Sequence, residues 1–141
     1  MQFDFKDQTI IVTGGTRGIG RGVSEAFLAS GGRVIATYHG NAKAAEQFRE
    51  TNKDHSDRLD LQCFDVSQYA DAEKFFDYID KTYGKFEVLV NNSGIRRDSV
   101  IAMMKETDWK QVIDTNLTGT FNMSKLAVRN LMKQRYGRII S

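Results

Sequence analysis

Residues Thr13–Gly20 read Thr-Gly-Gly-Thr-Arg-Gly-Ile-Gly and directly follow an apolar run, Thr9–Val12. Apolar residues then recur at helical spacing until Gly31-Gly32, so the segment predicts a strand, a glycine turn and a helix. Glycine permits the unusual backbone angles of a tight turn and lets a ligand approach the main chain. A helix that begins there offers free N–H groups and the positive end of its dipole to an anion. The segment therefore predicts a turn that binds a dinucleotide pyrophosphate; an ordinary strand-to-helix turn is the alternative.

Strands and helices alternate along the rest of the chain. We expect strands at 33–38, 59–64, 86–90 and from 137 onward, helices at 42–51, 72–79 and about 109–134, and a polar loop at 52–57. Parallel neighbours need crossover helices, and right-handed crossovers give a doubly wound parallel sheet. The fold class is thus α/β, Rossmann-type, with ligands at the carboxyl ends of the strands. We expect the fold to be truncated after the start of the fifth strand.

Composition narrows the class of protein. The 141 residues, 40% of them hydrophobic, suit one domain covering 1–141. Twenty basic and eighteen acidic side chains are interspersed, which gives no reason to expect a nucleic-acid partner. Cys63 is the one cysteine, so we expect no internal disulfide and no metal site. No apolar run approaches the roughly 18 residues that a membrane helix needs, and the start lacks a targeting pattern, so we expect a soluble, cytoplasmic protein.

Four motifs in order carry a resemblance to a known family. They are the glycine turn, Asp65-Val66, Asn91-Asn92-Ser93-Gly94 and Thr115-Asn116-Leu117-Thr118-Gly119. With them, the chain resembles the N-terminal part of a short-chain dehydrogenase/reductase, in particular the bacterial 3-oxoacyl-acyl-carrier-protein reductases. The resemblance runs from about Phe5 to Ser141.

The resemblance implies a nicotinamide cofactor and assigns residues to it. Asp65 would accept a hydrogen bond from the adenine amino group, with the backbone of Val66 beside the ring; capping of the following turn is the alternative for Asp65. Asn92 and Gly94 would place backbone against the adenosine ribose. The remaining assigned residues line the phosphates or complete the turn: Gly14, Gly15, Thr16, Arg17, Gly18, Ile19 and Gly20.

The choice of cofactor rests on the residues that follow the second strand. Sites for NAD usually place an acidic residue there, whereas this chain has Thr37-Tyr38-His39-Gly40. Arg17 can pair with a 2′-phosphate, and His39 or Thr37 can donate to it. The sequence therefore predicts NADP(H), although a histidine at such a position is as often a solvated loop residue.

Asn116 matches the family's active-site asparagine, whose backbone carbonyl holds a water that feeds the catalytic lysine; a local helix kink is the alternative. The family's catalytic serine, tyrosine and lysine cannot be assigned. Ser141 aligns with a non-catalytic strand residue, and Tyr-x-x-x-Lys occurs nowhere in the chain. General acid catalysis needs a proton donor, so we expect no reductase activity from these 141 residues alone.

The resemblance implies NADPH-dependent reduction of a 3-oxoacyl thioester, on acyl-carrier protein or coenzyme A, to the 3-hydroxyacyl thioester. It also implies a homo-oligomer, a tetramer in the full-length family. Two alternatives remain. One is another short-chain reductase, such as an acetoacetyl-coenzyme A reductase. The other is a truncated fragment that binds nucleotide or associates with itself without catalysis, because an open sheet edge and an apolar helix face favour pairing.

Overall fold

The computed structural model describes residues 3–141; Met1 and Gln2, with which the predicted domain begins, lie outside them. Five parallel strands form one sheet in the order β3-β2-β1-β4-β5. The strands are β1 (Thr9–Val12), β2 (Arg33–Tyr38), β3 (Leu59–Cys63), β4 (Val88–Val90) and β5 (Arg138–Ile140). The longer helices are α1 (Gly18–Ala29), α2 (Ala42–Thr51), α3 (Tyr69–Thr82), α4 (Glu106–Ile113) and α5 (Gly119–Gln134). The predicted doubly wound α/β fold is confirmed.

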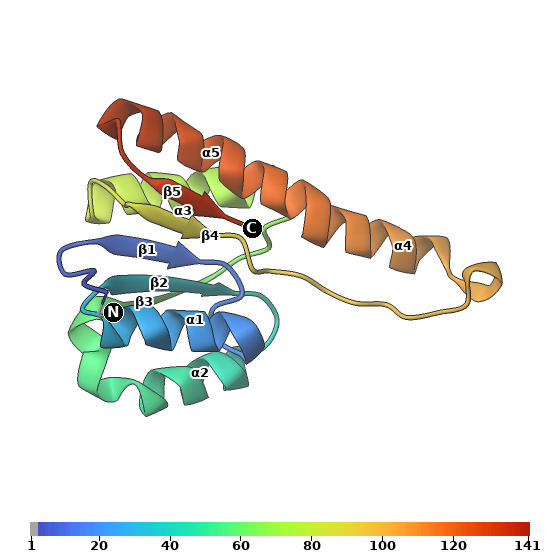
Figure 1. The fold of residues 1–141 in the computed structure, drawn as a ribbon. Helices are drawn as coiled ribbons and strands as arrows, with labels where there is room; N and C mark the ends of the chain where they lie inside the picture. The colour runs from blue at the N-terminus through green and yellow to red at the C-terminus, as the bar shows by residue number, and fades with distance from the viewer. Residues whose placement is uncertain (1–2) are drawn as a thin grey trace.

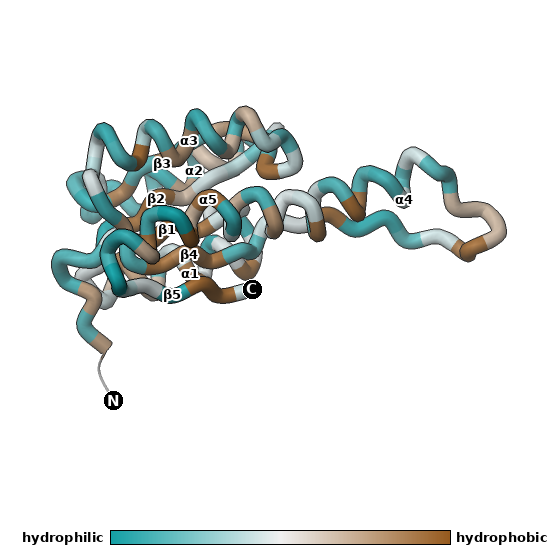
Figure 2. The backbone as a smooth tube through the Cα atoms, turned by 90° about the horizontal axis from the view of Figure 1, so that it is seen from above, coloured by the Kyte–Doolittle hydropathy of each residue, from teal (hydrophilic) through white to brown (hydrophobic). Residues whose placement is uncertain are grey.

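The helices cover both faces of the sheet (Figure 1): α1 and α2 lie on one face, α3 and α5 on the other. Side chains alternate along β1, so that Ile10 packs with Leu28 and Phe48 on the first face. Ile11 points the other way and packs in the cluster that contains Ile79 and Met123. The apolar run of β1 is therefore buried on both sides. Figure 2 shows the hydrophobic character of the central strands.

The strand order reverses beside β1, which pairs with β2 on one side and with β4 on the other. The chain that follows β1 therefore crosses over toward β2, and the chain that follows β4 crosses over in the opposite direction, toward β5. Such a reversal opens a crevice beyond the carboxyl ends of β1 and β4. At the amino ends of β1 and β4, the buried carboxylate of Glu87 links the two strands. Its Oε2 accepts the Thr9 N–H at 2.7 Å, and its Oε1 lies 3.2 Å from Lys85 Nζ.

The predicted strands and helices are present, but several bounds differ: β3 ends at Cys63, β4 begins at Val88, and α3 extends over Tyr69–Thr82. The strand at 33–38 and the helix at 42–51 are confirmed residue for residue. The loop predicted at 52–57 is wrong, because Lys53–Arg58 forms a 3₁₀ helix. Arg58 fixes this helix against the body of the fold by donating from Nη1 to the carbonyls of Leu28 and Gly32, at 3.0 and 2.7 Å.

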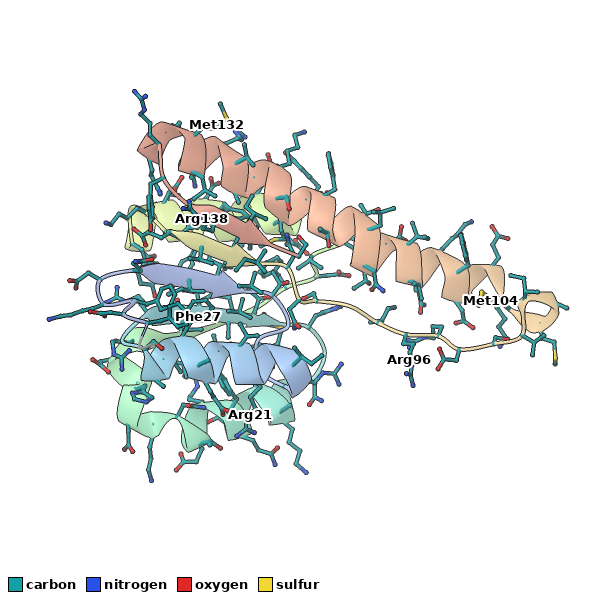
Figure 3. The ribbon with its side chains drawn as sticks, viewed as in Figure 1. Arg21, Phe27, Arg96, Met104, Met132 and Arg138 are labelled. Carbon is teal, nitrogen blue, oxygen red and sulfur yellow. The ribbon has the colours of Figure 1, made fainter. Side chains whose placement is uncertain are left out.

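An arm projects beyond the carboxyl ends of the strands. It consists of the extended segment after β4, a short 3₁₀ turn at Ile101–Met103 and α4 (Figure 1). Arg96 and Met104 lie on it, away from the sheet (Figure 3). Val100, Ile101 and Met103 are exposed near its tip. The helix predicted at 109–134 begins at Glu106 and is interrupted by a π-helical turn, Asp114–Thr118.

Candidate functional site

The glycine turn adopts the backbone conformation that its sequence predicts. Gly14 and Gly18 have φ values of +61° and +54°, in the left-handed region that favours glycine. The turn is anchored to both neighbouring strands: the Thr13 N–H donates to Val90 O and the Gly15 N–H to Thr37 O, each at 3.0 Å. The main chain between β1 and α1 is therefore held in place by the sheet.

Asn92 clamps the turn from the end of β4. Its Nδ2 donates to the carbonyls of Thr13 and Gly14, both at 3.1 Å, and its N–H donates to Thr13 Oγ1 at 3.0 Å. Gly20 lies directly beneath this clamp. A Cβ at Gly20 would press against Gly14 O and Asn92 Nδ2 at separations that real Cβ atoms do not show. The absence of a side chain at Gly20 thus lets the first turn of α1 approach the clamped loop.

The amino end of α1 is free to bind an anion. Arg17 precedes the helix and provides no side-chain cap, and the first turn carries no acidic residue. By contrast, α2 is capped by Asn41, whose Oδ1 accepts the Ala44 N–H at 3.0 Å. The first N–H groups of α1 therefore lack a side-chain acceptor and sit at the positive end of the helix dipole.

A cavity of about 490 Å³ opens at this helix end, beyond the carboxyl ends of β1, β2, β3 and β4. Its lining joins segments that are far apart in the sequence. Predicted site residues in the lining are Gly14, Thr16, Arg17, Gly18, Ile19, His39, Asp65, Val66, Asn92 and Gly94. The cavity lies where a doubly wound sheet binds its ligand, at the point where the strand order reverses.

Three predicted cofactor residues do not line the cavity. Gly15 and Gly20 are buried beneath the turn and shape it from below. Thr37 is 1% exposed, because β2 is covered on both faces, and it serves the turn through its carbonyl. We therefore correct the expectation that the Thr37 hydroxyl donates to a phosphate.

The sequence reasoning missed six residues of the lining. They are Tyr38, Asn41, Phe64, Ser93, Ile95 and Thr115. Four of them, Tyr38, Asn41, Phe64 and Ser93, lie at or just after the carboxyl end of a strand. Their position in the sequence could therefore have predicted that they line the cavity. Ser93 and Thr115 stand in two of the motifs quoted above, which did not assign them to the site; Thr115 reaches the cavity from the π-helical turn.

Asp65 caps a turn and also faces a histidine. Its Oδ1 accepts the Ser67 N–H at 2.9 Å, which is the alternative that its sequence position left open. Its Oδ2 lies 3.9 Å from His39 Nδ1. The His39 side chain is 64% exposed and the Asp65 side chain 29% exposed. One carboxylate oxygen thus remains directed toward the cavity rim, beside an imidazole.

Val66 forms the buried floor beside Asp65. Asn122 of α5 donates from Nδ2 to Val66 O at 2.9 Å and to Ser67 O at 3.2 Å. Gly119 lies so close that a Cβ there would meet Val66 Cγ2 at 2.6 Å. The Val66 carbonyl thus accepts a hydrogen bond within the protein, and its side chain packs in the core against α5.

Asn116 lies in the π-helical turn and does not line the cavity. Its side chain pairs with the backbone of Ile95: Oδ1 accepts the Ile95 N–H at 2.8 Å, and Nδ2 donates to Ile95 O at 3.0 Å. Its own carbonyl accepts the Thr120 hydroxyl at 2.8 Å. Asn116 therefore fixes the cavity wall formed by Gly94 and Ile95 through a π-helical interruption, a feature often found at functional sites.

Within residues 3–141, no group of three or more His, Cys, Asp or Glu side chains is arranged to hold a metal ion. In the same part of the chain, no helix has both the length and the apolar character to cross a membrane.

Comparisons with known proteins agree with this geometry. The model of the short chain dehydrogenase family matches residues 8–141. The 3-oxoacyl-acyl-carrier-protein reductase FabG of Escherichia coli is 36% identical over 140 residues, which cover 98% of this chain and 55% of the relative. The acetoacetyl-CoA reductase of Paracoccus denitrificans is 38% identical over 131 residues, covering 93% and 52%. The chain thus spans about half the length of the curated relatives it matches.

Solved structures share the fold. A putative gluconate dehydrogenase from Agrobacterium tumefaciens superposes with a TM-score of 0.90 at 28% identity, covering 99% of this chain and 55% of its own. A putative 3-oxoacyl-reductase from Bacillus thuringiensis gives a TM-score of 0.84 at 34% identity, covering 94% and 55%. With the family model matched over nearly the whole chain, the protein belongs to the short chain dehydrogenase family.

Proposed function

We propose that the cavity binds NADP(H) and that these residues supply the cofactor-binding part of a reductase. The observation that carries the proposal is the uncapped amino end of α1, which opens into the cavity beside Arg17. The arrangement fits a pyrophosphate, because free N–H groups and a helix dipole stabilise negative charge without a side-chain cap.

The preference for NADP(H) over NAD(H) rests on the charges at the end of β2. Tyr38, His39 and Asn41 line the cavity there, where NAD sites usually hold an acidic side chain on the ribose hydroxyls. Arg17 lines the same cavity from the glycine turn and, among residues 3–141, has no carboxylate within 4 Å. A guanidinium of this kind can bind a 2′-phosphate through two parallel hydrogen bonds.

For the reaction, we propose reduction of a 3-oxoacyl thioester to the 3-hydroxyacyl thioester, carried by acyl-carrier protein or coenzyme A. The similar proteins support this: one is a 3-oxoacyl-acyl-carrier-protein reductase and another an acetoacetyl-CoA reductase. In this assignment Asn116 positions the cavity wall through its two side-chain hydrogen bonds to Ile95. The water of the family's proton relay would be a second partner for its backbone carbonyl, which already accepts the Thr120 hydroxyl. The chemical step needs the Ser and Tyr-x-x-x-Lys set, which residues 3–141 do not contain.

A binding titration tests the cofactor proposal separately from turnover. The protein is titrated with NADPH and with NADH by calorimetry, for the native chain and for Arg17→Gln. We expect tighter binding of NADPH, and in Arg17→Gln a loss of about tenfold for NADPH with little change for NADH, as expected for one charge-assisted hydrogen-bond pair. Equal affinity for the two cofactors would contradict the proposal.

Arg21→Gln is the matched control. Arg21 lies on the same helix, one turn further along, where its Nε is 2.8 Å from Glu25 Oε1. Because it does not line the cavity, its loss should leave both affinities unchanged.

We also propose a homo-oligomer. Trp109, Leu117, Phe121 and Met132 are exposed along α4, the π-helical turn and α5, and Met132 points away from the sheet (Figure 3). β5 is exposed at the sheet edge as well. Exposed apolar surface of this extent favours association. Light scattering over a range of protein concentrations tests it: a mass that stays at 16.0 kDa would exclude an oligomer of this chain.

A further inference from the structure

A histidine and a carboxylate face each other at the rim of the cavity, where the end of β2 meets the loop after β3. His39 Nδ1 lies 3.9 Å from Asp65 Oδ2, and both side chains line the cavity together with Arg17. Asp65 therefore places a negative charge 3.9 Å from the imidazole of His39, the residue after β2 that is expected to donate to a 2′-phosphate. Whether this charge opposes the phosphate depends on the charge state of His39.

We propose that protonation of His39 strengthens the preference for NADP(H) over NAD(H), so that cofactor selectivity falls as the pH rises. This inference rests on the proposed function of the cavity. The protonated imidazole shields Asp65 and donates a charge-assisted hydrogen bond to the 2′-phosphate. The neutral imidazole leaves the Asp65 carboxylate uncompensated, and the phosphate then meets a like charge.

The pH range follows from the residue types around the site. The titratable side chains of the lining are Arg17, Tyr38, His39 and Asp65. Of these types, only histidine ordinarily changes charge between about pH 5 and 8. Arg17 keeps its charge throughout and supplies the part of the selectivity that does not vary. NADH lacks the 2′-phosphate, so the pH dependence of its dissociation constant reports any effect of pH on the rest of the site.

The experiment measures the dissociation constants of NADPH and NADH at about pH 6 and about pH 8.5, for the native protein and for His39→Gln. The quantity of interest is the ratio of the NADH to the NADPH constant. The 2′-phosphate itself titrates near pH 6, and His39→Gln removes this contribution because the variant binds the same ligand without an imidazole. Since His39 is exposed, the substitution leaves the core intact.

We expect the ratio to fall between the two pH values by about two- to fivefold more in the native protein than in His39→Gln, the range for a partly exposed charge pair. Asp65→Asn should raise the ratio at high pH and weaken its pH dependence, because the opposing charge is gone. His55→Gln is the matched control: the other histidine lies in the 3₁₀ helix, bonded to Arg58 at 3.0 Å, and does not line the cavity.

The possible outcomes separate the two proposals. A ratio with the same pH dependence in the native protein and in His39→Gln overturns the role of His39 and leaves the NADP(H) site standing. Absence of saturable NADPH binding at both pH values overturns the proposed function and, with it, this inference. A pH dependence that disappears in His39→Gln but persists in His55→Gln supports both.

Discussion

Replacing Gly20 with alanine tests whether the glycine turn is built as the structure shows. The new Cβ would have to displace Gly14 O and Asn92 Nδ2, which together form the clamp on the turn. Overpacking of this kind costs about 1–3 kcal/mol, more than the 0.5–1 kcal/mol or so that alanine gains over glycine within a helix. We therefore expect Gly20→Ala to lower the free energy of unfolding and to weaken NADPH binding.

Gly22→Ala provides the control within the same helix. A Cβ at Gly22 meets nothing within 4 Å, so only the helix propensity of alanine acts. This variant should be more stable by about 0.5–1 kcal/mol and should bind NADPH as the native protein does. Urea unfolding followed by circular dichroism measures both changes. The reasoning is refuted if Gly20→Ala is as stable as the native chain, or if the two substitutions shift stability in the same direction.

Three further predictions concern other contacts. Asn92→Ala removes both side-chain bonds to the turn and should cost about 1–3 kcal/mol in a thermal melt; an unchanged melting temperature would show that the clamp contributes nothing. Glu87→Ala leaves the buried Thr9 N–H without its acceptor and should cost about 1–3 kcal/mol in urea, whereas Glu87→Gln keeps an acceptor and should cost less; equal losses would argue against the bond. Burial and the hydrogen bond to Asp60 raise the pKa of Tyr83 above its ordinary value, so the stabilising contribution of Tyr83 is present below about pH 10 and is lost as the pH rises. Above about pH 10, the free energy of unfolding should therefore fall less steeply in Tyr83→Phe than in the native protein. Equal slopes for the two proteins would contradict this prediction.

Hydrophobic patterning was enough to predict the fold. The strand at 33–38 and the helix at 42–51 were predicted without error because each combines an unbroken pattern with a clear boundary. Gly32 precedes the strand, and Asn41 caps the helix. The segment at 52–57 was predicted incorrectly because its residues are polar and carry no periodicity. Its helix depends on Arg58 reaching two carbonyls in another part of the chain, which no local pattern reveals.

The candidate site was predicted unevenly for a related reason. Gly14, Thr16–Ile19, Asn92 and Gly94 line the cavity as expected, since backbone conformation and strand ends fix their location, whereas Gly15 and Gly20 lie beneath the turn. Thr37 was placed wrongly because a strand buried on both faces gives no sign of which way a side chain points. The pairing of His39 with Asp65 joins two loops whose spacing along the sequence says nothing about their distance.

The location of the cofactor is tested most directly by mapping amide chemical shifts while NADPH is added to the labelled protein. The account predicts saturable changes concentrated on the glycine turn at 14–20, on His39, on Asp65 and on residues 92–95, all around the cavity. No saturable change, or saturable changes confined to the amino ends of the strands near Glu87, would contradict the account.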